Sequence, residues 1–194
     1  NIIHVENGID PIRDIEIINL ELSISDLEII NGRISRIAKK AQTNRDKDAL
    51  KELETLNKAK EALECGKPLR LVAFTEEDLA LLKNFSLITL KPVIYLANVS
   101  EEDLTNDNNY VQMVTEYAKK EGAQTVKICA KLESELSELN DDDKKEMLSV
   151  VGIEESGLDK LIKITYDILG LATYFTVGSD EVRAWTFKKG MNAK

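Results

Sequence analysis

The stretch Pro92-Val93-Ile94-Tyr95-Leu96-Ala97-Asn98-Val99-Ser100-Glu101 decides how this chain folds, because a continuous apolar run ends there in a polar loop. Such a run is typical of a buried strand in a parallel sheet. In sheets of this kind, ligands bind beyond the carboxyl ends of the strands. Asn98 and Glu101 would stand at such an end. The same residues are also typical of a turn that caps the next helix, so both interpretations are open at this point.

The C-terminal half alternates between strand and helix patterns. We expect strands at 93–97 and 125–129, and helices from Thr75 and over 110–120, 141–151 and 158–169. This alternation predicts an α/β fold with a parallel sheet. Two further strand patterns, 173–177 and 182–187, flank a Gly178-Ser179-Asp180 turn and predict a β-hairpin that begins another small domain.

Residues 10–68 carry a helical pattern. Asp10 followed by Pro11 is a strong helix start. Apolar residues then recur every three to four positions, at Ile17, Leu20, Ile24, Leu27, Ile30, Ile34 and Ile37. After a polar break at 42–45, a second helix from Asp46 ends at Gly66-Lys67-Pro68. The pattern predicts an antiparallel coiled-coil hairpin with a narrow apolar seam.

The far end of this hairpin is basic. Nine basic and four acidic residues lie between Gly32 and Lys60, although the whole chain has a net charge of −9. Arg33, Arg36 and Lys40 share one helical face. The face is either a solvated surface or a contact for RNA phosphates.

Composition narrows the classes of protein that remain. The chain has 194 residues, of which 43% are hydrophobic and 31% charged, so it can bury a sizeable core. No apolar run approaches the roughly 20 residues that span a bilayer. The net charge argues against a wholly basic nucleic-acid coat. Cys65 and Cys129 lack the spacing of a metal or redox pair, which favours a reducing compartment such as the cytoplasm and predicts no metal site.

Two loops at consecutive strand ends resemble the base-reading loops of P-loop GTPases. Asn98-Val99-Ser100-Glu101 resembles their Asn-Lys-x-Asp loop, with Val99 in place of the lysine and Glu101 in place of the aspartate. Cys129-Ala130-Lys131 resembles their Ser-Ala-Lys loop. The resemblance implies a site for a nucleotide base formed by these two loops. Because adenine lacks the two donors that the aspartate binds in guanine, the replacements favour ATP over GTP.

Three longer stretches resemble the YchF/Obg-like ATPase family. They are residues 10–19, residues 90–101, and Thr173-Tyr174-Phe175-Thr176 with residues 181–186. The resemblance implies a P-loop G domain that is interrupted by a helical hairpin and followed by a β-grasp TGS domain. On this basis we expect a residual G-domain loop (1–9), the hairpin (10–68), the C-terminal part of the nucleotide-binding G domain (69–171) and the start of the TGS domain (172–194).

The resemblance also implies an activity, a cofactor and a partner. His4, in Asn-Ile-Ile-His-Val, matches a family histidine that is implicated in hydrolysis, and it would orient the attacking water. The sequence contains no Gly-x-x-x-x-Gly-Lys-Ser/Thr and no Asp-x-x-Gly loop after a strand, since its one Asp-x-x-Gly, at residues 167–170, lies at the end of the helix expected over 158–169. We therefore expect a fragment that is inactive alone, with the ligands of Mg²⁺ and of the ATP or GTP phosphates in an upstream segment. The implied partner is the ribosome. The alternative is a non-enzymatic helical module that docks on RNA or protein through Arg33, Arg36 and Lys40.

Overall fold

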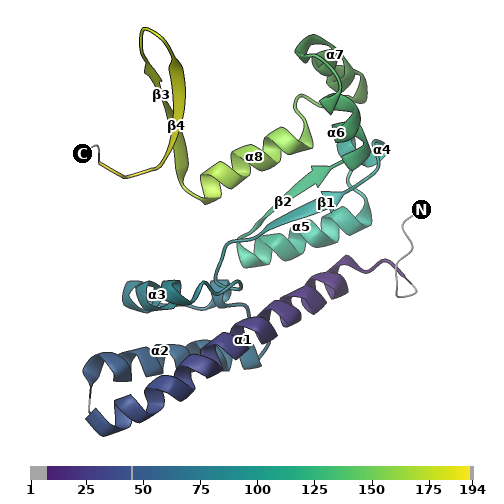
Figure 1. Cartoon of the computed structure of the whole chain (residues 1–194). Helices are drawn as coiled ribbons and strands as arrows, with labels where there is room; N and C mark the ends of the chain where they lie inside the picture. Colours follow the sequence, from purple (N-terminus) through teal and green to yellow (C-terminus); the bar gives the residue numbers. More distant parts are fainter. Residues whose placement is uncertain (1–7, 45, 193–194) are drawn as a thin grey trace. The chain divides into compact units, whose positions relative to one another are not determined.

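The computed structural model describes residues 8–44 and 46–192, without the side chains of residues 40–44. The chain divides into two compact units. The first runs up to Val93 and also takes in residues 119–123, and the second contains residues 94–118 and those from 124 onward. Figure 1 labels their helices and strands.

The first unit is built on a helical hairpin. Its helices are α1 (Pro11–Asn44), α2 (Lys47–Glu64) and α3 (Glu76–Leu82), with short 3-10 turns at Leu69–Leu71 and Lys83–Phe85. The pairing of α1 with α2 confirms the predicted hairpin (Figure 1). The capping signals also act as expected, since Asp10 accepts a hydrogen bond from the Arg13 N–H at 3.1 Å. Asp46 likewise accepts from the N–H groups at the start of α2.

The core of this unit lies between the hairpin and the segment around α3. It contains eight buried apolar residues, Ile30, Ile37, Leu56, Ala59, Leu63, Leu69, Leu82 and Leu87. The predicted seam of α1 is therefore right for its second half. It is wrong for Ile17, Leu20 and Ile24, which are between 42% and 52% exposed.

The buried positions in the first half of α1 are polar instead. We call Asn19, Ser23 and Asp26, which are all buried, the polar root of α1. The Asp26 carboxylate accepts hydrogen bonds from the N–H groups of Ile88 and Thr89, at 2.9 and 2.8 Å, and from the Thr89 hydroxyl at 2.7 Å. A buried carboxylate is tolerated because these donors replace water.

Arg70 extends the same polar contacts. Its Nη2 group donates to Oδ1 of Asn19 at 3.1 Å and to Oε2 of Glu121 at 2.9 Å. The Arg70 and Glu121 side chains are only 10% and 7% exposed. The Arg70 N–H also donates to the Thr89 carbonyl at 2.9 Å. The base of the hairpin is thus held by paired polar groups as well as by apolar packing.

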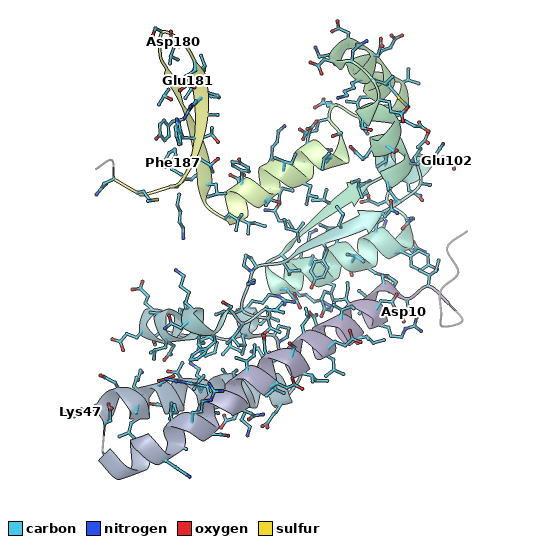
Figure 2. The ribbon with its side chains drawn as sticks, in the orientation of Figure 1. Asp10, Lys47, Glu102, Asp180, Glu181 and Phe187 are labelled. Atoms are coloured by element: carbon cyan, nitrogen blue, oxygen red, sulfur yellow. The ribbon has the colours of Figure 1, made fainter. Side chains whose placement is uncertain are left out.

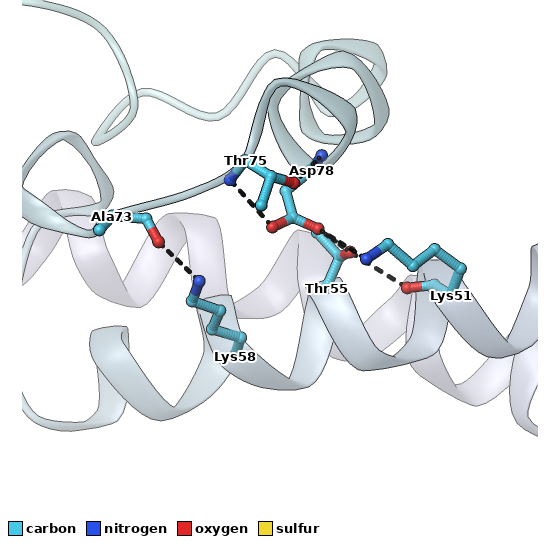
Figure 3. A network of polar contacts seen from close by, with 6 residues as sticks. All are labelled: Lys51, Thr55, Lys58, Ala73, Thr75 and Asp78. Carbon is cyan, nitrogen blue, oxygen red and sulfur yellow. Dashed lines mark hydrogen bonds and ion pairs between the residues drawn. The ribbon is translucent and has the colours of Figure 1, made fainter.

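A second polar cluster holds α3 against α2, as Figure 3 shows. Asp78 accepts from the Thr55 hydroxyl at 2.7 Å and from the Thr75 N–H at 3.1 Å. Thr75 and Asp78 form a capping box, which confirms the helix start predicted at Thr75. Lys51 lies 3.8 Å from the same carboxylate, and Lys58 donates to the Ala73 carbonyl at 2.6 Å.

The second unit contains the strands. Its elements in chain order are β1 (Ile94–Asn98), α4 (Glu102–Thr105), α5 (Asn109–Glu121, of which the last residues belong to the first unit), β2 (Gln124–Ile128), α6 (Ala130–Ser137), α7 (Asp141–Val151), α8 (Gly157–Ile168), β3 (Leu171–Val177) and β4 (Val182–Lys188). β1 and β2 form a parallel pair, which confirms the α/β class, and β3 and β4 form the predicted antiparallel hairpin. The helix α6 was not predicted.

The hairpin of β3 and β4 carries exposed apolar side chains. Asp180 and Glu181 are labelled at its turn in Figure 2. Within this turn the Gly178 N–H donates to the Glu181 carbonyl at 2.9 Å. Tyr174 and Phe187 pack edge to face, with ring centroids 5.7 Å apart. Phe175 on the same strand as Tyr174 is 69% exposed.

Candidate functional site

The two loops that the sequence singled out begin at the same edge of the parallel pair. Asn98, the last residue of β1, is paired in register with Ile128, the last residue of β2. The pairing continues one step into the loops, because the Val99 N–H donates to the Ile128 carbonyl at 2.8 Å. Val99 and Cys129 therefore start the two loops side by side, as expected for parallel strands.

Asn98 connects the two loops. Its Oδ1 atom accepts a hydrogen bond from the Ala130 N–H at 3.1 Å. Ala130 is the first residue of α6, and the first N–H groups of a helix have no partner within the helix. The residue before it, Cys129, provides no side-chain cap. Asn98 therefore caps α6 from the neighbouring loop and fixes the distance between the two strand ends.

A second contact joins the same loops. The Lys131 ammonium lies 3.1 Å from Oε1 of Glu101 and 3.6 Å from Oε1 of Glu135. The hydrogen bond with Glu101, followed by the charges of Glu101 and Glu135, raises the pKa of Lys131. Since the Lys131 side chain is 74% exposed, water screens this pair and its energy is small. Its effect is geometric, because it holds the Glu101 carboxylate toward the second loop.

Four of the six residues predicted to bind a base are thus brought together. Val99 is half-buried beside them. The Cys129 side chain differs, since it is 4% exposed and packs with Leu132, Leu136 and Leu148. Only the backbone of Cys129 can therefore face a ligand.

The other predicted residues, His4, Arg33, Arg36 and Lys40, differ in how they are placed. His4 lies outside the described residues, and so does the side chain of Lys40. Arg36 is exposed on α1. Arg33 is bonded within the hairpin, where it donates to Glu52 on α2. The three cations are therefore not an equivalent basic face, since Arg33 already has an acidic partner.

One contact beside the loops was missed by the sequence analysis. Glu133, in the first turn of α6, accepts hydrogen bonds through Oε1 from the N–H groups of Gly157 and Leu158, at 2.8 and 3.4 Å. These two residues begin α8, and they are separated from Glu133 by the whole of α7. The only local signal of this contact is the pair Ser156-Gly157. Ser156 caps α8, whereas the glycine that follows it caps nothing itself and so indicates another reason for its presence.

Within the described part of the chain, no group of three or more His, Cys, Asp or Glu side chains could hold a metal ion. The described residues therefore offer no such cluster that would hold Mg²⁺ by itself. No described helix is both long and apolar enough to cross a membrane.

Comparison with known proteins finds similar whole proteins but no matching family model. The chain is 53% identical over 195 residues to a Bacillus subtilis protein named ribosome-binding ATPase YchF, covering 100% of this chain and 53% of that protein. It is 43% identical over 193 residues to the Escherichia coli O157:H7 protein of the same name, with the same coverage.

A solved structure also matches. It is described as the YchF GTPase of Schizosaccharomyces pombe, and its TM-score is 0.87 at 33% sequence identity, over 100% of this chain and 53% of that chain. The chain spans about half the length of the relatives it matches. Its parallel strand pair, its helical hairpin and these similarities together show that the chain is homologous, over its whole length, to about half of a YchF family protein.

Proposed function

We propose that this chain carries the base-binding loops of a YchF-type nucleotide hydrolase that favours ATP over GTP. The observation that carries the proposal is the hydrogen bond between Asn98 and the Ala130 N–H at the shared ends of β1 and β2. It places the two predicted loops together where ligands of parallel sheets bind. The relatives named as ribosome-binding ATPases support the same assignment.

The preference for ATP rests on the two replaced loop residues. In this proposal the Asn98 side chain and the Val99 carbonyl contact the adenine. Glu101 is one methylene longer than an aspartate and is held by Lys131 at 3.1 Å. Its carboxylate is therefore not positioned for the paired donors of guanine, and adenine does not need such an acceptor.

The triphosphate would be bound by residues outside this chain. The sequence contains no Gly-x-x-x-x-Gly-Lys-Ser/Thr motif, and its one Asp-x-x-Gly, at residues 167–170, lies at the end of α8 rather than in a loop after a strand. When bound with ATP, Mg²⁺ would neutralise charge on the phosphates. His4 would orient the attacking water. We expect the chain by itself to be inactive.

Two features of the second unit support its being part of larger domains. Among the described residues, each of its sheets has only two strands, and a sheet of two strands is marginally stable by itself. Leu96 on β1 and Phe175 on β3 are also 48% and 69% exposed. In this proposal residues 69–171 complete a G domain, and residues 172–194 begin a TGS domain.

The proposed partner is the ribosome, and the protein would act in the cytoplasm. The bacterial relatives are named ribosome-binding, which favours this partner over an unrelated protein. Of the three cations predicted to bind RNA, Arg36 is the one whose described side chain is exposed and supports the hairpin as the contact with ribosomal RNA. The comparisons favour this nucleotide-dependent function over a purely non-enzymatic docking module.

Competition binding with the full-length protein tests the proposal. ATP should bind more tightly than GTP, and Asn98→Ala should weaken ATP binding by about 1–3 kcal/mol, because the Ala130 N–H and the adenine both lose a partner. The matched control is Asn106→Ala, which removes an amide in the loop after α4. Tighter binding of GTP than ATP would contradict the base assignment. RNA binding without any nucleotide binding would instead support the docking module.

A further inference from the structure

The end of β2, the first turn of α6 and the start of α8 meet directly beneath the second loop. Gly157 is the residue at which they touch. A Cβ atom added at Gly157 would lie 2.8 Å from the Lys127 carbonyl oxygen and 3.1 Å from the Ile128 Cα. These neighbours are backbone atoms of β2 and cannot turn aside. The start of α8 therefore lies against the strand as closely as a glycine allows.

This close packing leaves a donor that needs a partner. Gly157 is buried, and its N–H is one of the first in α8, where no helical carbonyl is available. Ser156 caps the N–H of Asp159 at 3.0 Å but not that of Gly157. The Glu133 carboxylate accepts the Gly157 hydrogen at 2.8 Å. A carboxylate is also the favoured charge at the start of a helix.

Glu133 is well placed to fix α6. It lies three residues after Ala130 in a helix of only eight residues. On another side of the same helix, Leu132 and Leu136 are almost fully buried beside Cys129. A short helix held both by this apolar side and by one carboxylate has little freedom to rotate. The direction of the Ala130 N–H therefore depends on the bond between Glu133 and Gly157.

We propose that Glu133 is a positioning residue for the second loop. Its bond to Gly157 sets the orientation of α6, which places the Ala130 N–H opposite Asn98 and the Lys131 ammonium opposite Glu101. That the positioned groups recognise a nucleotide base rests on the proposed function. The positioning itself rests on the distances within the second unit.

Three variants separate the acceptor from the charge. Glu133→Ala removes both, Glu133→Gln keeps an oxygen acceptor of the same reach, and Glu133→Asp keeps the charge but withdraws it by one methylene. Glu138→Ala is the matched control, because Glu138 is an exposed acid at the other end of α6. All four are made in the full-length protein.

The first measurement is the hydrogen exchange of the Ala130 amide without nucleotide. It should quicken by roughly tenfold in Glu133→Ala and Glu133→Asp, which corresponds to the loss of one hydrogen bond, and stay near wild type in Glu133→Gln and Glu138→Ala. The second is the ratio of affinities for ATP and for inorganic tripolyphosphate, which has no base. That ratio should fall by roughly tenfold in the same two variants, with tripolyphosphate affinity unchanged.

The outcomes separate the two proposals. If wild type binds ATP no better than tripolyphosphate, the proposed function fails, while amide exchange still decides whether Glu133 holds the loop. Unchanged exchange at Ala130 in Glu133→Asp overturns the positioning role. So does a Glu133→Gln variant that exchanges as fast as Glu133→Ala. Loss of affinity for ATP and tripolyphosphate alike would show a general defect of folding and would also overturn it.

Discussion

Arg33 on α1 and Glu52 on α2 form a two-point ion pair across the helical hairpin. The Nε and Nη2 groups of Arg33 donate to the two oxygens of Glu52, at 2.6 and 2.9 Å. The guanidinium also lies over the Phe85 ring, 5.9 Å from its centroid. Hydrogen bonding to Glu52 raises the pKa of Arg33. This arginine therefore holds the hairpin together, which separates it from the cations that could bind an external phosphate.

Reversing the charge of Arg33 should destabilise the hairpin. Arg33→Glu would place two carboxylates together, and we expect a loss of about 1–2 kcal/mol in the free energy of unfolding. The exchange Arg33→Glu with Glu52→Arg should recover most of it, because the opposite charges face each other again. Urea unfolding of the single reversal, the exchange variant and the wild type measures this. Equal midpoints for the single reversal and the wild type would show that the pair contributes nothing.

Reversing Arg36 should weaken ribosome association and leave folding intact. Arg36 is exposed, so its charge contributes at most about 1 kcal/mol to stability. If it contacts an RNA phosphate, Arg36→Glu should also reduce the slope of log affinity against log salt by about one. Sedimentation with ribosomes across a salt series checks this. Lys188→Glu, the same kind of change at an exposed position of β4, is the control. If Arg36→Glu and the wild type bind ribosomes equally at every salt concentration, the basic far end of the hairpin is only a solvated surface.

Asp78 should make stability depend on pH in acid. The hydrogen bond from Thr55, with those from Thr75 and the nearby Lys51 charge, lowers the pKa of Asp78 from 3.8 to about 2. Because the folded pKa is the lower one, this stabilisation is complete above about pH 4 and is lost as the pH falls toward 2. Its size is about 2 kcal/mol.

The variant Asp78→Asn tests this dependence. Its urea midpoint should lie below that of the wild type at pH 5, and the difference should shrink as the pH approaches 2. Asp142→Asn serves for comparison, since the Asp142 side chain is 96% exposed. If the urea midpoints of Asp78→Asn and the wild type differ by the same amount from pH 5 to pH 2, Asp78 is not the cause of the pH dependence.

His4 should affect turnover rather than binding. If it orients the attacking water, its contribution exists only in the transition state, so His4→Ala should lower kcat and leave ATP affinity nearly unchanged. Single-turnover hydrolysis and equilibrium ATP binding by the full-length protein separate the two quantities. A normal hydrolysis rate in His4→Ala would leave this histidine without a catalytic role.

The sequence was most informative where the structure depends on local patterns. β1 and β2 each lie within one residue of their predicted ranges, because continuous apolar runs and their polar ends are visible along the chain. The capping box at Thr75 and Asp78 spans only four residues, so it was also visible in the sequence. For the same reason the meeting of the two loops at one edge of the parallel pair followed from the order of the strands.

Contacts between distant residues explain what was missed. The start of α6 has no capping side chain of its own, since its cap is Asn98, 32 residues earlier. The buried side of the first half of α1 was predicted wrongly because the prediction followed the spacing of apolar residues, whereas the buried residues there are polar. Asp26 is buried there by virtue of donors on Ile88 and Thr89, which are more than 60 residues away. Only the folded chain reveals such partners.

The polar root of α1 lies near the middle of a long helix, so any tilt there would be magnified toward the end of the helix. The helix has 34 residues, so at 1.5 Å per residue it is about 51 Å long, and roughly 27 Å of it lies beyond Asp26. A tilt of about 10° at Asp26 would therefore carry the end of α1 through roughly 5 Å. A movement small enough to preserve the hydrogen bonds to Thr89 is thus large where the helix ends. Thr89, which donates to Asp26, lies five residues before β1 along the chain.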